Sequence, residues 1–125
     1  MIAITFLGIA ILIALSIFQA LLITGRPLGS YAWGGQYEVL PQRLRIASVF
    51  SIVLYVVFGI FLASKAGLVS IIPHTSFLAV AMWVFTCYFV LGIFMNAISH
   101  SKKERALMTP VALALAVIFL LVTLS

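Results

Sequence analysis

Four long stretches of apolar residues constrain the fold of this chain more than any other feature of its sequence. They cover residues 2–24, 46–64, 75–98 and 109–125 approximately, and they are continuous rather than alternating with polar residues. A helix needs roughly 20 apolar residues to cross the hydrocarbon core of a bilayer. Lipid admits only helices and closed barrels, and barrel strands alternate apolar and polar residues. The pattern therefore predicts an all-α membrane protein, with a four-transmembrane-helix bundle as a single domain over residues 1–125.

The composition agrees with a chain whose solvent is lipid. Hydrophobic residues make up 66% of the sequence and charged residues only 7%, whereas a soluble domain carries about 25% charged residues. The formal net charge of +5 would suggest nucleic acid as a partner of a soluble protein. Here the basic residues stand in short connections between spans, so we expect membrane lipids, and no nucleic acid, as partners.

The distribution of basic residues predicts the orientation of the spans. The connection between the second and third spans holds one basic residue, Lys65, and the other two connections hold six: Arg26, Arg43, Arg45, Lys102, Lys103 and Arg105. Lysine and arginine are enriched in cytoplasmic loops. We therefore expect the first and third connections in the cytoplasm and both termini outside it. The fourth span is expected to begin at Thr109, with Pro110 as its first helical residue.

The first connection, Gly25–Arg43, has an unusual composition for a linker. It contains four glycines and two prolines, which exclude a long helix, and three amphipathic aromatic residues, Tyr31, Trp33 and Tyr37. One interpretation is a loop anchored at the headgroup layer. The other is a loop that folds back onto the bundle and presents backbone N–H groups to a ligand. In either case we expect an ordered segment, with Trp33 against a span end or the headgroups and a turn at Gly34 and Gly35.

This connection also carries a resemblance to known proteins. The residues that carry it are Pro27-Leu28-Gly29, Ala32-Trp33-Gly34-Gly35, Leu40-Pro41, Leu44-Arg45, Ser48 and Met108-Thr109-Pro110. Over about a third of its length the chain resembles a group of small uncharacterised bacterial membrane proteins with four transmembrane helices. The resemblance implies the same architecture and a multi-pass protein of the bacterial inner (plasma) membrane. It implies no activity.

Polar residues inside the spans gather at the cytoplasmic ends of three of them. Ser16 and Gln19, then Ser48, Ser51 and Tyr55, then Asn96, Ser99 and His100 recur at helical spacing, so each set shares one helix face. If these faces converge, they line a polar recess beside the first connection, with arginines near its rim. Interhelical hydrogen bonds are the alternative explanation. The candidate ligand-binding residues are Gln19, Arg26, Trp33, Arg43, Arg45, Ser48, Ser51, Asn96 and His100.

Residues suited to catalysis or metal binding are scarce. His74 and His100 are expected on opposite sides of the membrane, Cys87 is the single cysteine, and the two acidic residues, Glu38 and Glu104, fall in the connections. A metal site needs more ligands than these can bring together, and acid–base catalysis needs a positioned proton-transfer group. We therefore expect no metal, no cofactor and no enzymatic activity.

Two functions remain open from the sequence. The first is the binding or transport of an anionic or amphipathic ligand, such as a lipid headgroup, through a cytoplasm-facing polar recess. The second is a non-catalytic accessory or structural subunit of a larger membrane assembly or a homo-oligomer. Pairs of small residues four apart, such as Ala112 and Ala116, would let helices pack closely within the chain or between subunits.

Overall fold

The computed structural model describes residues 1–125 and confirms the predicted all-α fold. The chain forms four long helices, α1 (Ile2–Ile23), α2 (Gln42–Lys65), α3 (Ser76–Ala97) and α4 (Lys102–Leu124), and two short 3-10 helices, η1 (Gly29–Tyr31) and η2 (Trp33–Gly35). Each of the four long helices is long and apolar enough to cross a membrane. The protein is therefore a multi-pass membrane protein with four candidate transmembrane helices.

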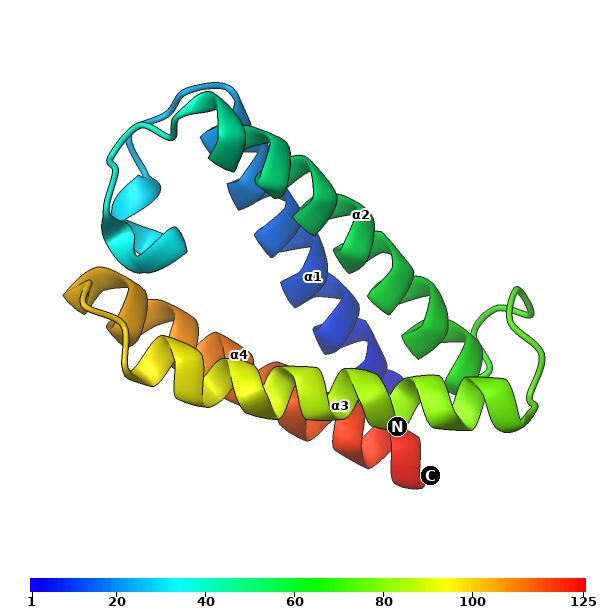
Figure 1. Ribbon diagram of the computed structural model, residues 1–125. Coiled ribbons are helices and arrows are strands. Elements are labelled where there is room, and N and C mark those ends of the chain that lie inside the picture. The colour runs from blue at the N-terminus through cyan, green and yellow to red at the C-terminus, as the bar shows by residue number, and fades with distance from the viewer.

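The helices pair as two antiparallel hairpins that diverge from one another. α1 packs mainly along α2, and α3 packs mainly along α4. Figure 1 shows the two hairpins close together at the end that holds both termini and apart at the other end, so that the ribbon outlines a V. The segment between α1 and α2, residues 24–41 and called loop 1 below, lies at the wide end and carries η1 and η2.

An aromatic core closes the narrow end. Phe58 of α2 is 1% exposed, and its ring centre lies 4.8 Å from that of Phe85, 4.9 Å from that of Phe89 and 6.1 Å from that of Phe119. These rings belong to α2, α3 and α4, and Leu12 of α1 joins the same buried cluster. Edge-to-face and tilted aromatic contacts of this kind add to the gain from burial. All four helices therefore meet in a packed core in this half of the molecule.

Loop 1 is an ordered element, as its composition predicts. The Gly29 N–H donates to the Glu38 carbonyl (2.8 Å), and the Trp33 indole N–H donates to the Ser48 hydroxyl of α2 (3.3 Å). Trp33, Gly34 and Gly35 all have positive φ, at 51°, 75° and 71°, and form the expected turn. The Ser101 hydroxyl, just before α4, donates to the Ser30 carbonyl. Loop 1 therefore connects the two hairpins across the wide end.

The predicted start of the fourth helix is wrong by eight residues. α4 begins at Lys102, and its N-cap Ser101 accepts a hydrogen bond from the Glu104 N–H (3.3 Å). Pro110 lies inside the helix, where it removes one backbone hydrogen bond, at a cost of about 3 kcal/mol in an ordinary helix. A serine followed three residues later by glutamate is a capping signature, and it outweighs the Thr109–Pro110 pair as the helix start.

Candidate functional site

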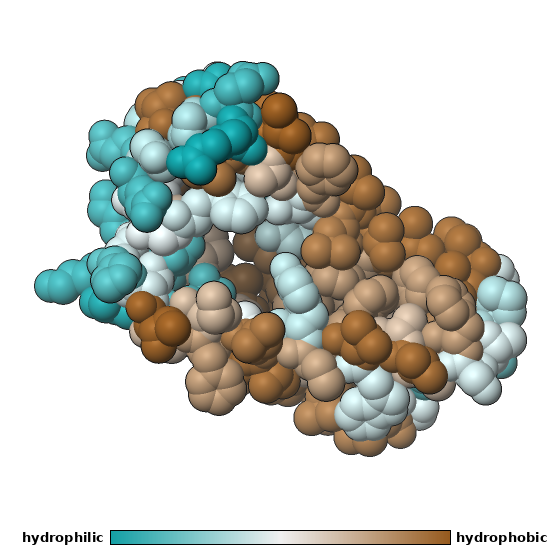
Figure 2. Space-filling model, viewed as in Figure 1, coloured by the Kyte–Doolittle hydropathy of each residue, from teal (hydrophilic) through white to brown (hydrophobic).

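A cavity of about 550 Å³ lies between the two hairpins in the wide half of the molecule. Its 22 lining residues come from all four long helices, loop 1 and the α3–α4 connection. Figure 2 shows the hollow between α2 and α3, bordered by hydrophilic surface toward loop 1 and by hydrophobic surface along the helices. The diverging hairpins create the space, and loop 1 bounds it at the wide end.

Five of the nine predicted site residues line this cavity. They are Gln19 of α1, Trp33 of loop 1, Ser51 of α2, Asn96 of α3 and His100 of the α3–α4 connection. Ser48 is fully buried and supports the site indirectly, because its hydroxyl accepts the Trp33 indole N–H. The structure thus brings the polar faces of α1, α2 and α3 around one space.

The predicted arginines do not line the cavity. Arg43 donates to the Tyr37 hydroxyl (3.1 Å) and lies over the Tyr37 ring, 5.9 Å from its centre. Arg45 donates to the Leu40 carbonyl (2.8 Å). The Arg43 and Arg45 guanidinium groups therefore fasten the start of α2 to loop 1, and Arg26 is exposed. The expected arginine rim therefore makes no contribution to the lining.

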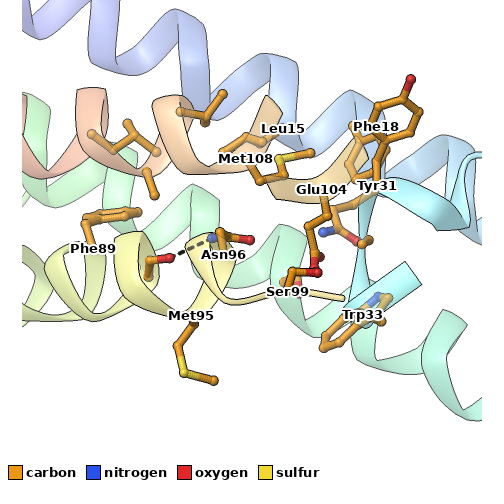
Figure 3. Close-up of a pocket in the computed structure, with 18 of the residues that line it drawn as sticks. Leu15, Phe18, Tyr31, Trp33, Phe89, Met95, Asn96, Ser99, Glu104 and Met108 are labelled. Atoms are coloured by element: carbon orange, nitrogen blue, oxygen red, sulfur yellow. Dashed lines mark hydrogen bonds between the residues drawn. The ribbon is translucent and has the colours of Figure 1, made fainter. Parts of the chain in front are cut away.

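Two amide side chains, Gln19 and Asn96, belong to the lining of the cavity. Gln19 is only 6% exposed, and its Oε1 is buried without a hydrogen-bond partner. Asn96 donates through Nδ2 to the Gly92 carbonyl (2.8 Å), the bond drawn in Figure 3, and its oxygen is left as an acceptor. A buried acceptor without a donor costs about 1–3 kcal/mol. A bound group with N–H or O–H donors would remove this cost.

Glu104 is a site residue that sequence reasoning missed. It is 8% exposed, lines the cavity from the first turn of α4, and accepts a hydrogen bond from the Ser99 hydroxyl. Figure 3 shows its carboxyl group beside Ser99. The expected helix start at Thr109 placed Glu104 in a loop. With the helix starting at Lys102, Glu104 falls at helical spacing on the face of Met108, Val111, Ala112 and Leu115, which also line the cavity.

Aromatic and aliphatic side chains form the rest of the wall. Fourteen of the 22 lining residues are hydrophobic, and six of the 22 are aromatic: Phe18, Tyr31, Trp33, Tyr55, Tyr88 and Phe89. A second pocket of about 250 Å³, lined only by hydrophobic residues, lies between α1 and α4 and shares Leu15, Phe18, Met108 and Val111 with the cavity. The site is therefore amphipathic, with a few polar groups set in an apolar wall.

The residues suited to metal binding stay apart. No group of three or more His, Cys, Asp and Glu side chains is arranged to hold one metal ion. His100 lines the cavity, whereas His74 lies beyond the other end of α3, where its Nε2 is hydrogen-bonded to the Ser64 carbonyl (2.8 Å). Cys87 is exposed on α3.

Comparisons with known proteins give no assignment for this site. Neither protein-family models, nor curated proteins, nor solved structures match the chain.

Proposed function

We propose that this protein binds an amphipathic molecule in the cavity between its two hairpins. The observation that carries the proposal is the combination, in one cavity of about 550 Å³, of Gln19, Asn96 and Glu104 with a wall of aromatic and aliphatic side chains. Ligand sites are typically apolar clefts of about 300–1,000 Å³ with a few convergent polar groups. The polar groups suit a headgroup, and the wall suits a hydrocarbon tail.

The distribution of charge supports access from the cytoplasmic side. Six of the seven basic residues lie in loop 1, the start of α2 and the start of α4, at the wide end, and Lys65 ends α2 at the narrow end. The positive-inside rule then places the wide end in the cytoplasm and both termini outside it. The resemblance of loop 1 to bacterial proteins supports the inner membrane as the location.

The residues of the cavity favour binding over catalysis, and the packed aromatic core of the narrow half favours binding over transport. Glu104 is the only carboxylate in the lining, so the site has no pair of carboxyl groups for acid–base catalysis. Transport would require the aromatic core around Phe58 to open while the wide end closes. An anionic ligand also loses its main support, because the arginines lie outside the cavity. An accessory or structural role remains the alternative, and it predicts that the cavity holds no small molecule.

A variant that fills the cavity tests this proposal. Ser51 lines the cavity, so Ser51→Trp should occupy the space available to a ligand. Val53, two positions along α2, is 57% exposed, so Val53→Trp adds the same side chain to the outer face. Native mass spectrometry of protein extracted in mild detergent should show a small amphipathic adduct on the parent protein and on Val53→Trp. The adduct should be absent from Ser51→Trp, and an equal adduct on both variants would contradict the proposal.

A further inference from the structure

We infer that the cavity selects amphiphiles whose headgroup is a protonated primary amine, with Glu104 as the counter-charge. The inference deepens the proposed function and rests on it. It assigns the ammonium group to the space between Glu104, Gln19 and Asn96, and the alkyl chain to the aromatic wall. The ammonium group can belong to a membrane lipid with an amino headgroup or to a free alkylamine, because both present the same donors.

The side chains that line the cavity include one formal charge, and it is negative. Glu104 is the only formally charged side chain among the 22 lining residues, whose other titratable groups are His100 and three tyrosines. The basic neighbours of Glu104 are directed elsewhere. Lys103 is exposed, with its Nζ 5.7 Å from the centre of the Tyr31 ring, and Arg105 donates to the Ser99 carbonyl (3.1 Å). A charge buried in an apolar wall favours an opposite charge on the ligand and disfavours a like one.

The hydrogen-bonding groups narrow the class of cation. The Glu104 carboxylate has one side-chain partner, the Ser99 hydroxyl, Gln19 Oε1 has none, and one of the two N–H donors of the Asn96 amide is used within α3. The carboxylate of Glu104 therefore has lone pairs left for further N–H donors. A primary ammonium supplies three N–H donors, as lysine does, whereas a quaternary ammonium supplies none. Hydrogen bonds between charged partners are also the stronger kind.

The aromatic wall suits both parts of such a ligand. Aromatic faces attract cations, and this chain already uses that contact twice, with Lys103 over Tyr31 and Arg43 over Tyr37. Deeper in the cavity, Tyr88 and Phe89 belong to the aromatic cluster around Phe58, which offers apolar surface to an alkyl chain. A cation near loop 1 with its tail toward the narrow end would match both environments.

The two tryptophans allow a direct test. Trp33 lines the cavity, and Trp83 is 45% exposed on α3 and is not part of the lining. In Trp83→Phe protein, quenching by bromine reports occupancy of the cavity, and in Trp33→Phe protein it reports partition into the surrounding lipid. Four probes share a 6-bromododecyl chain, whose bromine lies in the half of the ligand nearer the head and Trp33, and differ in the head: ammonium, trimethylammonium, alcohol and sulfate. Each is titrated into phosphatidylcholine nanodiscs, and quenching of Trp33 is normalised to that of Trp83.

We expect the ammonium probe to quench Trp33 at about a tenfold lower concentration than the alcohol, because it adds charge-assisted hydrogen bonds. Glu104→Gln should remove this preference while alcohol binding persists, and Glu104→Asp should retain it. Glu38→Gln, which removes the other acidic charge from exposed loop 1, should leave the ammonium preference unchanged.

Brominated lipids identify the source of the amine. If brominated phosphatidylethanolamine quenches Trp33 more than brominated phosphatidylcholine does, the source is a lipid. If only the free amine quenches Trp33, the source is a free amine.

Failure of the ammonium inference can be distinguished from failure of the proposed binding function. Alcohol binding without a preference for ammonium, a preference for sulfate, or an unchanged ammonium preference in Glu104→Gln would overturn the inference and leave the proposed function standing. If none of the four probes quenches Trp33 beyond the level seen at Trp83, the proposed function itself is overturned.

Discussion

Gln19 is the buried polar side chain whose hydrogen bonding in the structure is incomplete and which the proposed binding site would explain. Its amide is buried on α1, yet Oε1 has no hydrogen-bond partner in the structure. Ser16, one turn earlier, is satisfied by the Leu12 carbonyl (2.8 Å). An unsatisfied amide among apolar helices is costly, and such costs are typical of functional sites.

Replacement of Gln19 by an apolar residue of similar size should therefore stabilise the ligand-free protein. We expect Gln19→Leu to raise the free energy of unfolding by about 1 kcal/mol, the lower end of the cost of a buried unpaired acceptor, and to weaken amphiphile binding. Thermal unfolding in detergent, with and without dodecylammonium, measures both effects. Ser16→Ala serves as the control that removes a satisfied hydroxyl. A loss of stability in Gln19→Leu would show that the amide has a structural partner.

Some residues of the candidate site were predictable from the sequence and others were not. Helical spacing was enough to predict that Gln19, Ser51 and Asn96 line one cavity, because the helices of a membrane protein turn their polar faces away from lipid. The same spacing could not place Arg43 and Arg45, whose long side chains reach Tyr37 and Leu40 within loop 1 instead of the cavity. Glu104 was missed for a local reason, since its role depends on where α4 begins.

At the scale of elements, loop 1 is a folded segment held in place by hydrogen bonds, rather than a flexible linker. It is fixed to itself by the Gly29–Glu38 hydrogen bond, to α2 through Trp33 and to the start of α4 through Ser101. A small buried cluster packs Ala32 and Leu40 of loop 1 against Leu22 of α1. Because Trp33 belongs both to this loop and to the cavity wall, the fold of loop 1 and the shape of the site are coupled.

Gly29 should tolerate no side chain in this loop. A Cβ at this position would lie 1.8 Å from the Tyr37 carbonyl oxygen, which is backbone and can move only if the loop unfolds locally. At Gly34 a Cβ meets nothing within 4 Å, so Gly34→Ala bears only the strain of its positive φ, about 1–2 kcal/mol.

We therefore expect Gly29→Ala to increase trypsin cleavage after Arg43, where loop 1 meets α2, and to shift Trp33 emission to the red, both more strongly than Gly34→Ala does. Limited proteolysis and the fluorescence of the Trp83→Phe variants measure these effects. Equal behaviour of the two glycine variants would contradict the packing of Gly29 against Tyr37.

The elements were predictable to different degrees. The four spans followed from apolar length, since lipid allows little else, and the order in loop 1 followed from its glycines and aromatic residues. The start of α4 did not follow, because Ser101–Glu104 and Thr109–Pro110 are both acceptable helix starts, and the structure uses the Ser101 cap. The divergence of the two hairpins, on which the cavity depends, is encoded in no local pattern.

At the scale of the whole molecule, the V shape separates a packed half from a half with a cavity. The narrow half holds the phenylalanine cluster and both termini, and the wide half holds loop 1 and most of the positive charge. This asymmetry is the basis for proposing a binding protein that is open toward one side of the membrane.

The charge asymmetry predicts the result of a topology measurement. A reporter fused after Ser125 should behave as extracytoplasmic, and one inserted between Lys102 and Arg105 should behave as cytoplasmic, because six basic residues gather at the latter end. Dual alkaline phosphatase and green fluorescent protein fusions distinguish the two sides. The opposite pattern would place the mouth of the cavity outside the cell.

Thiol accessibility at position 51 tests whether the cavity between the two hairpins opens to the cytoplasm and takes up an amphiphile. In a Cys87→Ser background, Ser51→Cys puts a thiol in the cavity wall, and Val53→Cys puts one on the outer face of α2. We expect a membrane-impermeant maleimide to label Ser51→Cys from the cytoplasmic side of inside-out vesicles, dodecylamine to suppress this labelling, and Val53→Cys to remain unlabelled. Ser51→Cys that stays unlabelled from the cytoplasmic side, or whose labelling dodecylamine leaves unchanged, would contradict a cytoplasm-facing site for an amphipathic ligand.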